Sequence, residues 1–358
     1  MIRMQSKAEL AALLDKVADR MKNLKNEGYE EKYPIGLIDI NLWEWPQGVG
    51  IYGLYKYYLD TGRQDILDFL HSWYSERIRQ GLPEKNVNTM SPMLTLIGLY
   101  QMNSDKVYLE LCDEWSTWIM KEMIRTGDGA LQHMITGDPN DGQILIDTLF
   151  MTCLFLAKAG EVLGRPEYVE EAKKQFLVHI KYLYDKSCGL FYHGWDFNEM
   201  HNYGAVHWAR GNSWYTCGLV DFLDMVEVEP GLRQYLLDTF NAQVAALEKY
   251  QNSSGLWHTV IDDTTSYLET SATAAFGYGI LKGIRRGYLD AKYMEMGLKA
   301  VEGVLSQISA DGIVQGVSYG TPVGKDAQFY KDIPVCPMTY GQALTLLLLT
   351  EAIKIAKE

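Results

Sequence analysis

Six segments of the chain carry apolar residues at helical spacing with charged residues between them. In the first, Leu10, Leu14, Val17 and Met21 recur every three or four positions, which predicts a helix with one buried face. The five others begin near Asp65, Lys106, Pro166, Gly231 and Asp290. The pattern therefore predicts six amphipathic helices.

Between these segments lie six stretches that are apolar or small on nearly every side. Residues 148–157 (TLFMTCLFLA) and 343–349 (ALTLLLL) have no polar face, and residues 271–275 (SATAA) are small enough for backbones to approach closely. Each stretch predicts a buried helix. The six begin near Trp45, Ser91, Asp147, Asn212, Ser271 and Tyr340.

Buried and amphipathic helices alternate along the chain, and short turns such as residues 61–63 (TGR) join each buried helix to the next amphipathic one. An inner ring of six buried helices within an outer ring of six amphipathic helices satisfies both patterns. We therefore expect an all-α fold, an (α/α)6 barrel of six helical hairpins, formed by residues 1–358 as a single domain. An open helical solenoid is the alternative, and the even count of six disfavours it.

The connections that return to the buried helices are long, and the alternating helix directions gather them at one end. Four of them share a phrase in which Gly opens a turn before an apolar run that reaches a polar residue. These phrases are residues 128–133 (DGALQH), 188–193 (CGLFYH), 254–258 (SGLWH) and 311–315 (DGIVQ). Long loops on a rigid scaffold often carry function, and helix N-termini favour anions, so we expect the site at this end.

Composition narrows the function classes. The net charge of −13, without a basic stripe, disfavours nucleic acid as a partner. The five cysteines are far apart and lack CxxC spacing, so they indicate neither a disulfide framework nor a zinc site. We expect no signal peptide and no membrane span, hence a soluble cytoplasmic protein, monomer or homodimer. Phosphate-binding loops, HExxH and GxSxG are missing, which disfavours nucleotide and metal chemistry.

Many aromatic residues fall in the long connections, and rings combined with polar groups suit a sugar. Trp45 and Trp214 are two of them, although aromatic rings also fill cores. Asp147 stands between apolar runs where a buried helix begins. It could cap that helix and stay ionised, or act as a general acid with a pKa raised by its apolar surroundings. The spacing alone does not decide between these two roles.

Arg210 lies in residues 208–214 (WARGNSW) at the start of another buried helix. It could pair with a substrate carboxylate through two hydrogen bonds, or it could tie a loop to the barrel by an ion pair. His133 and His193 end two of the related hairpin phrases. A single histidine is usually structural, but the repeated position favours contact with a ligand or a part in proton transfer.

At these residues the sequence resembles glycoside hydrolase family 105, the unsaturated rhamnogalacturonyl hydrolases. The most specific matching phrases are residues 147–151 (DTLFM) and 209–214 (ARGNSW). Others are residues 43–50 (WEWPQGVG), 86–92 (NVNTMSP), 131–133 (LQH) and 192–196 (YHGWD). The order of the phrases and their places in the hairpins fit the family, whose members are six-hairpin barrels.

The resemblance implies an exo-acting enzyme that removes the 4,5-unsaturated uronic acid from the non-reducing end of lyase-generated pectin fragments. Its substrate is thus an unsaturated uronic-acid oligosaccharide, and it needs no cofactor or metal. The reaction is hydration of an enol ether, with Asp147 protonating C4 and water adding at C5. The same carboxylate, once deprotonated, can activate the water. The implied substrate-binding residues are Trp45, Asn88, His133, His193, Arg210 and Trp214.

The sequence departs from the family pattern at two positions. Asn88 stands where related enzymes can carry a second acid, so we expect it to bind substrate. Leu145 replaces an expected aromatic residue two positions before Asp147, which alters one wall of the sugar pocket. Three alternatives remain: an unsaturated glucuronyl hydrolase acting on glycosaminoglycan fragments, a sugar epimerase, and a non-catalytic sugar-binding barrel.

Overall fold

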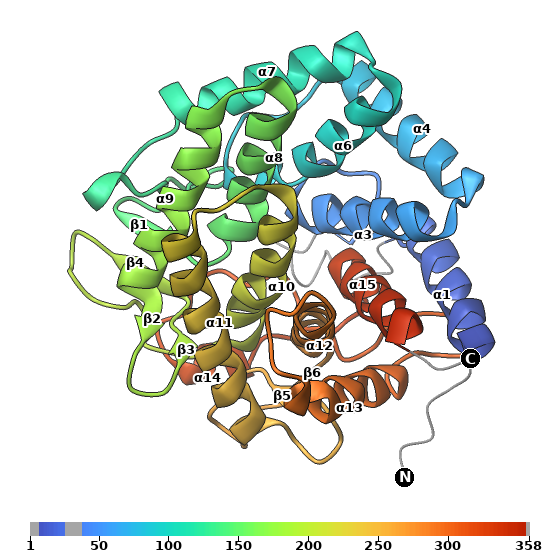
Figure 1. The fold of residues 1–358 in the computed structure, drawn as a ribbon, viewed down its shortest axis with the longest axis vertical. Helices are drawn as coiled ribbons and strands as arrows, with labels where there is room; N and C mark the ends of the chain where they lie inside the picture. The colour runs from blue at the N-terminus through green and yellow to red at the C-terminus, as the bar shows by residue number, and fades with distance from the viewer. Residues whose placement is uncertain (1–6, 26–37, 356–358) are drawn as a thin grey trace.

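The computed structural model describes residues 7–25 and 38–355. The expectation that the N-terminal stretch is not a signal peptide concerns residues 1–6 in part, and these lie outside the described ranges. Within them the chain forms an inner and an outer ring of helices (Figure 1). The inner helices are α3 (Trp45–Thr61), α6 (Met93–Asn103), α8 (Leu154–Leu163), α10 (Ala209–Met225), α12 (Thr270–Arg285) and α15 (Thr339–Ile355). The outer helices are α1 (Lys7–Lys22), α4 (Gln64–Gln80), α7 (Lys106–Lys121), α9 (Pro166–Leu183), α11 (Pro230–Tyr250) and α13 (Met294–Leu305).

The inner helices form a closed ring. Each contacts the next in chain order, and α15 returns to contact α3. Each outer helix packs against an inner one, and the pair that completes the set is α1 with α15. The expected (α/α)6 barrel is confirmed, and the open solenoid is excluded because its ends would not meet.

Burial follows the predicted pattern. On α4 the apolar face of Ile66, Leu70 and Trp73 is buried while most of the helix faces outward, whereas α12 and α15 are buried over nearly their whole length. Each fully buried large apolar side chain stabilises the fold by about 1.5–3 kcal/mol. The ring closes tightly at Gly53, where a Cβ atom would lie 2.6 Å from Cβ of Ala343. Glycine is thus required for α3 to approach α15.

A buried polar cluster links three inner helices toward their C-terminal ends. The carboxylate of Asp221 on α10 accepts hydrogen bonds from Tyr52 on α3 at 2.7 Å and from Tyr278 on α12 at 2.6 Å. Lys282 on α12 forms an ion pair with the same carboxylate. Burial raises the pKa of Asp221, but Lys282 and Lys56 outweigh it and hold that pKa well below its usual range. The buried charge is therefore compensated.

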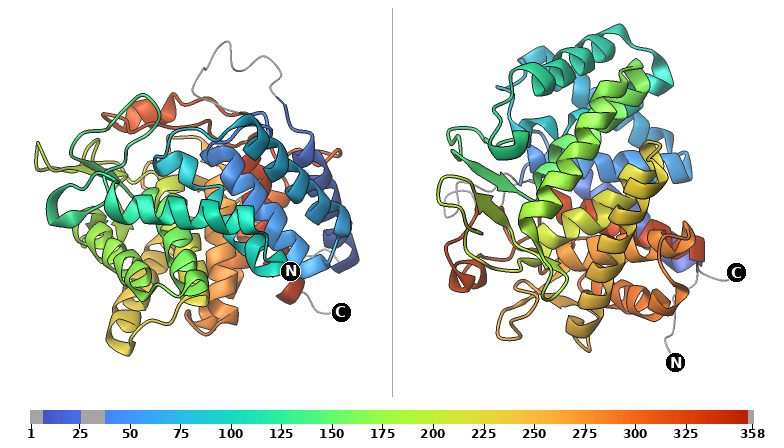
Figure 2. Two further views of the ribbon diagram at one scale, coloured as in Figure 1. Left: turned by 90° about the horizontal axis from the view of Figure 1, so that it is seen from above. Right: turned by 60° about the vertical axis from the view of Figure 1, so that its left-hand side comes forward.

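The long connections, with short strands and the small helices α5 (Val87–Met90) and α14 (Ala327–Lys331), lie at the other end of the barrel (Figure 2). Three two-stranded sheets occur among the described residues: β1 (Gln143–Leu145) with β4 (Gly194–Asp196), β2 (Tyr184–Asp185) with β3 (Leu190–Phe191), and β5 (Trp257–His258) with β6 (Leu268–Glu269). Gly189 and Gly255 have φ of 88° and 86°, as the hairpin phrases predict.

Two inner helices begin differently from the expectation. The segment expected to start near Ser91 is split into α5 and α6, because Asn86 caps α5 through its side chain and Pro92 precedes α6. The segment expected to start at Asp147 opens with a π-helical turn, η2 (Leu149–Cys153), before α8. Such turns are rare and often lie at functional sites. Two single-turn 3₁₀ helices, η1 (Gly127–Gly129) and η3 (Ala291–Tyr293), complete the described elements. Among the described helices, none combines the length and the apolar character that spanning a membrane requires.

Candidate active site

A cavity of about 450 Å³ opens at the loop end of the barrel. Five of the seven residues expected at the site line it, together with Leu145, which stands where an aromatic residue was expected. These five are Trp45, Asn88, His133, Asp147 and Arg210. Residues 320–323 form part of the opposite wall. The long connections thus bring predicted residues from five separate segments to one cavity.

The β1–β4 ladder explains how Asp147 and His193 come together. Leu145 pairs with Gly194, and the N–H of Ile146 donates to the carbonyl of His193 at 3.0 Å. The N–H of His133 donates to the carbonyl of Gln143 on the other side of β1 at 2.8 Å. Backbone pairing therefore places both histidine phrases beside the segment that carries Asp147.

Asp147 faces the cavity with a side chain that is 16% exposed, and its Oδ2 lies 3.3 Å from Nε2 of His193. Among the described residues, no backbone N–H donates to its carboxylate, although its own carbonyl accepts from Phe150 and Met151. The helix-capping role is therefore not the one this side chain has. It is held instead by its histidine neighbour.

The charge state of Asp147 differs from the expectation. Burial raises its pKa, but the contact with His193 lowers it, with smaller lowering effects from His133 and Arg210, and the net effect is a pKa below the usual value. The expectation of a raised pKa, based on apolar neighbours in sequence, is wrong for the ligand-free protein. The histidines and the arginine that outweigh burial come from other connections.

His193 lies behind Asp147 and is only 1% exposed, so it does not line the cavity. Its Nδ1 is 2.7 Å from the hydroxyl of Tyr330 on α14, and that hydroxyl oxygen accepts from the N–H of Gly324 at 3.0 Å. The Tyr330 hydroxyl is then free to donate to Nδ1, which leaves the ring proton on Nε2, the atom that lies 3.3 Å from Oδ2 of Asp147. His193 is thus placed to orient Asp147.

His133 lines the cavity and is held through Nδ1 by the hydroxyl of Thr148 at 2.9 Å. Burial lowers its pKa to about 4, against the raising effect of Asp147. The imidazole is therefore neutral at neutral pH. It offers Nε2 for hydrogen bonding rather than a positive charge.

Arg210 is completely buried and holds the loop that contains Ser318 and Thr321. One Nη donates to the carbonyl of Ser318 at 2.8 Å and to its hydroxyl; the other donates to the carbonyl of Tyr319 at 3.0 Å and to Thr321 Oγ1 at 2.9 Å. Both Nη groups are engaged, so the expected two-bond pair with a substrate carboxylate is not available in this conformation. The loop-tying role is observed, with neutral oxygens in place of a carboxylate.

The two tryptophans expected at the site have different positions. Trp45 lines the cavity and stacks on Tyr340 with ring centroids 4.6 Å apart. Trp214 is completely buried, 6.3 Å from the Trp45 ring and 4.9 Å from the Phe150 ring. It supports Trp45 from the core and does not reach the cavity, because its place on α10 points it inward.

The sequence reasoning overlooked Glu44, Asp138 and Tyr330. Glu44 and Asp138 line the cavity; Glu44 caps α3 by accepting from the N–H of Trp45 at 3.0 Å. Burial raises the pKa of Glu44, and this effect exceeds the lowering effect of its hydrogen bonds with the Trp45 N–H and the Thr136 side chain. Glu44 stands at the start of a buried helix, like Asp147, and that signal could have found it. Nothing in the sequence pattern places Tyr330 beside His193.

An (α/α)6 barrel with aromatic rings and carboxylates around a cavity at its loop end defines the class of helical-barrel glycoside hydrolases. The chain belongs to Glycosyl Hydrolase Family 88, whose family model matches residues 13–356. It is 34% identical over 318 residues to unsaturated rhamnogalacturonyl hydrolase YesR of Bacillus subtilis (strain 168), covering 88% of this chain and 91% of that protein.

Two solved structures agree with this placement. Both are described as possible members of the GH105 family, one from Salmonella enterica (43% identity, TM-score 0.95) and one from Klebsiella pneumoniae (42% identity, TM-score 0.94). Each covers 99% of this chain, and the alignments cover 96% and 95% of the solved chains, respectively. The resemblance seen in the sequence motifs is confirmed, and the protein is a glycoside hydrolase.

Proposed function

We propose that the protein is an unsaturated rhamnogalacturonyl hydrolase. It removes the 4,5-unsaturated galacturonyl residue from the non-reducing end of rhamnogalacturonan fragments made by lyases. The observation that carries the proposal is Asp147: it faces the cavity, contacts His193 and, within the part of the chain that the structure describes, accepts no backbone N–H that would make it a helix cap. The similarity to YesR over nearly its whole length supports the substrate class.

In the proposed reaction, Asp147 donates a proton to C4 of the double bond. Water adds at C5, and the resulting carboxylate of Asp147 takes the proton of that water. The hemiketal then opens and releases the rest of the oligosaccharide. Trp45 supplies an aromatic face for the sugar, and Asn88 and His133 supply hydrogen bonds to its hydroxyls.

The acid must be protonated to act, yet its pKa is low in the ligand-free protein. The substrate itself resolves this. The cavity is lined by three carboxylates (Glu44, Asp138 and Asp147), one guanidinium and the neutral His133. A uronate carboxylate entering this site adds a negative charge, and like charges raise the pKa of a neighbouring acid. Substrate binding therefore takes up the proton that the reaction uses.

The test is to incubate the protein with unsaturated disaccharides from pectin lyases and from glycosaminoglycan lyases, following loss of ultraviolet absorbance by the double bond. Turnover of the pectin-derived substrate that disappears in Asp147→Asn supports the proposal. Turnover of the glycosaminoglycan substrate alone would instead indicate an unsaturated glucuronyl hydrolase. Binding without turnover would indicate a sugar-binding barrel.

We also propose that the protein acts in the cytoplasm. Its five cysteines are all free thiols. Free thiols persist where the redox environment is reducing.

A further inference from the structure

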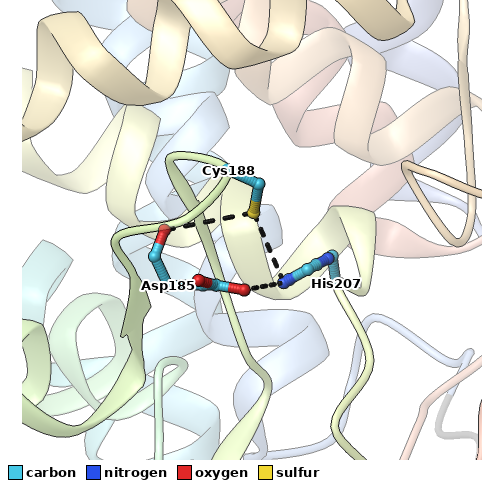
Figure 3. Close-up of side chains that lie close together, drawn as sticks. All are labelled: Asp185, Cys188 and His207. Atoms are coloured by element: carbon cyan, nitrogen blue, oxygen red, sulfur yellow. Dashed lines mark hydrogen bonds and ion pairs between the residues drawn. The ribbon is translucent and has the colours of Figure 1, made fainter.

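Three side chains that the proposed reaction does not use converge beside the β2–β3 hairpin: Asp185, Cys188 and His207 (Figure 3). Nε2 of His207 lies 3.4 Å from Oδ2 of Asp185 and 3.7 Å from Sγ of Cys188. Their three polar atoms all lie within 4.8 Å of one another. Asp185 and Cys188 come from the hairpin, and His207 comes from the segment that leads into α10.

The His207 ring is fixed from two sides. Its Nδ1 lies 2.7 Å from Oδ2 of Asp262, and its face stacks on Tyr192 with ring centroids 4.8 Å apart. Tyr192 also donates to Oδ2 of Asp185 at 2.8 Å. A carboxylate on Nδ1 places the ring proton there and turns the lone pair of Nε2 outward, the arrangement found behind metal-binding histidines.

That lone pair faces two groups that are themselves electron-rich. The Asp185 carboxylate accepts hydrogen bonds from the N–H and hydroxyl of Ser187 through Oδ1 and from the Tyr192 hydroxyl through Oδ2, so it acts as an acceptor. Three groups can fill the space in front of this lone pair: the S–H of Cys188, which lies at hydrogen-bond distance, a second proton on His207, or a metal ion bound by all three side chains.

We propose that Asp185, Cys188 and His207 bind a zinc ion, with Asp262 orienting the histidine. Tetrahedral zinc with bonds of about 2.0–2.3 Å separates neighbouring donor atoms by about 3.3–3.6 Å. The two separations from Nε2 of His207, 3.4 and 3.7 Å, are close to these values, and the carboxylate oxygen and the sulfur lie within 4.8 Å of each other. One nitrogen, one sulfur and one oxygen donor suit the borderline-soft Zn²⁺ better than Mg²⁺ or Ca²⁺. Water completes the tetrahedron.

Zinc binding requires the thiolate of Cys188, so the S–H proton passes to solvent as the Zn–S bond forms. The bound ion joins the β2–β3 hairpin to His207, which directly precedes Trp208 of the cavity wall and the start of α10. The site therefore positions this wall and takes no part in the chemistry. Sequence motifs could not indicate this site, because its three ligands come from two separate connections and only one of the ligands is a cysteine.

The test uses the purified full chain after chelator treatment, titrated with Zn²⁺ in a calorimeter and, separately, with Co²⁺ as a spectroscopic substitute. We expect one Zn²⁺ per chain, a Co²⁺ spectrum with a thiolate charge-transfer band, and a rise in melting temperature on adding zinc. Cys188→Ser and His207→Gln should each weaken zinc binding at least about 100-fold, and Asp262→Asn about 10–100-fold.

The matched control is His201→Gln, which removes an exposed histidine with a carboxylate partner, Glu199, but no third ligand. It should bind zinc like the wild type, and circular dichroism should show that every variant is folded. Wild-type protein that takes up no more zinc than His207→Gln overturns the proposal. So does a cobalt spectrum without the thiolate band. His207 is then a doubly protonated bridge between Asp185 and Asp262.

Discussion

Nε2 of His193 lies 3.3 Å from Oδ2 of Asp147, and the β1–β4 ladder fixes this approach through the backbone of both residues. The histidine is completely enclosed by Trp208, Tyr330 and Asp147, while the acid faces the cavity. A buried imidazole thus lies against an accessible carboxylate and lowers its pKa. The first three predictions depend on this pair and its surroundings.

Replacing Asp147 by Asn should reduce turnover of the unsaturated substrate by at least about 10²–10⁴-fold, because the amide can neither donate the proton nor activate water. Loss of ultraviolet absorbance measures the rate. Glu44→Gln is the matched control, since Glu44 is the other half-buried acid of the cavity with a shifted pKa. A larger loss in Glu44→Gln than in Asp147→Asn would transfer the role of acid to Glu44.

Binding of an anionic sugar should be accompanied by proton uptake. The pKa of Asp147 is below its usual value in the free protein, so the free acid is ionised at neutral pH, and the bound uronate raises that pKa. Calorimetric titration with a saturated galacturonyl-rhamnose disaccharide in buffers of different ionisation enthalpy measures the uptake, with an expected upper limit of about one proton. For the same reason kcat/KM should fall as pH rises toward neutrality. Zero uptake, or equal uptake by Asp147→Asn, would contradict this.

Tyr330→Phe should alter the pH dependence of the reaction. Without the hydroxyl, Nδ1 of His193 loses the donor that keeps the ring proton on Nε2, so the lowering effect on the pKa of Asp147 weakens. The alkaline limb of the kcat/KM profile should move to higher pH, while stability falls by only about 1 kcal/mol. Tyr203→Phe, a half-buried tyrosine in a nearby connection, serves as the control. An unchanged profile would mean that Tyr330 only packs.

Arg210→Lys should loosen the loop that contains Ser318 and Thr321. An ammonium group keeps the charge but lacks the planar fork that reaches both sides of the loop. Lost hydrogen bonds to a charged group cost about 1.5–3 kcal/mol, measured by urea denaturation, and KM should rise as the cavity wall moves. Arg286→Lys, in an exposed ion pair with Asp224, should change stability by less than about 0.5 kcal/mol. Equal effects in both variants would exclude the loop-holding role.

Lys282→Met should destabilise the protein by about 3–5 kcal/mol at neutral pH, because it leaves the buried Asp221 without its ion-pair partner. In the wild type the pKa of Asp221 is depressed on folding. The contribution of Asp221 to the free energy of unfolding is therefore complete above its pKa in the unfolded chain, and it is lost as pH falls through its pKa in the folded protein. At acidic pH Asp221 becomes protonated in the variant, so the difference in unfolding free energy between the variant and the wild type becomes smaller. Urea denaturation at neutral and acidic pH checks this, with the exposed Lys354→Met as control; a gap independent of pH would contradict it.

The fold could be predicted because burial differs on the two kinds of helix. Outer helices bury one stripe and inner helices bury nearly every side, so hydrophobic periodicity alone distinguishes them. Only the first turns of α6 and α8 differ from the prediction, where Pro92 and a π-helical turn intervene. Those local features lie outside what periodicity reports.

The site was predictable where residues stand at or just before the starts of inner helices: Trp45 begins α3, Asn88 lies in α5 directly before α6, and Asp147 precedes the turn that leads into α8. The site was not predictable where the path of a long connection determines which side chains come into contact. The low pKa of Asp147, the engagement of Arg210 by residues 318–321 and the contact of Tyr330 with His193 all depend on segments far apart in sequence. Trp214 was expected in the cavity but lies in the core, because sequence patterns do not distinguish a core tryptophan from one that lines a pocket.

The pairing of α1 with α15 has a consequence for how the protein is made. The apolar face of α1 is synthesised more than 300 residues before α15, which packs against it. The part of this face that α15 covers, which includes Val17, therefore lacks its native partner until α15 has been synthesised. Closure of the ring is thus a late step of folding, and the barrel can unfold cooperatively as one unit only after α15 has docked.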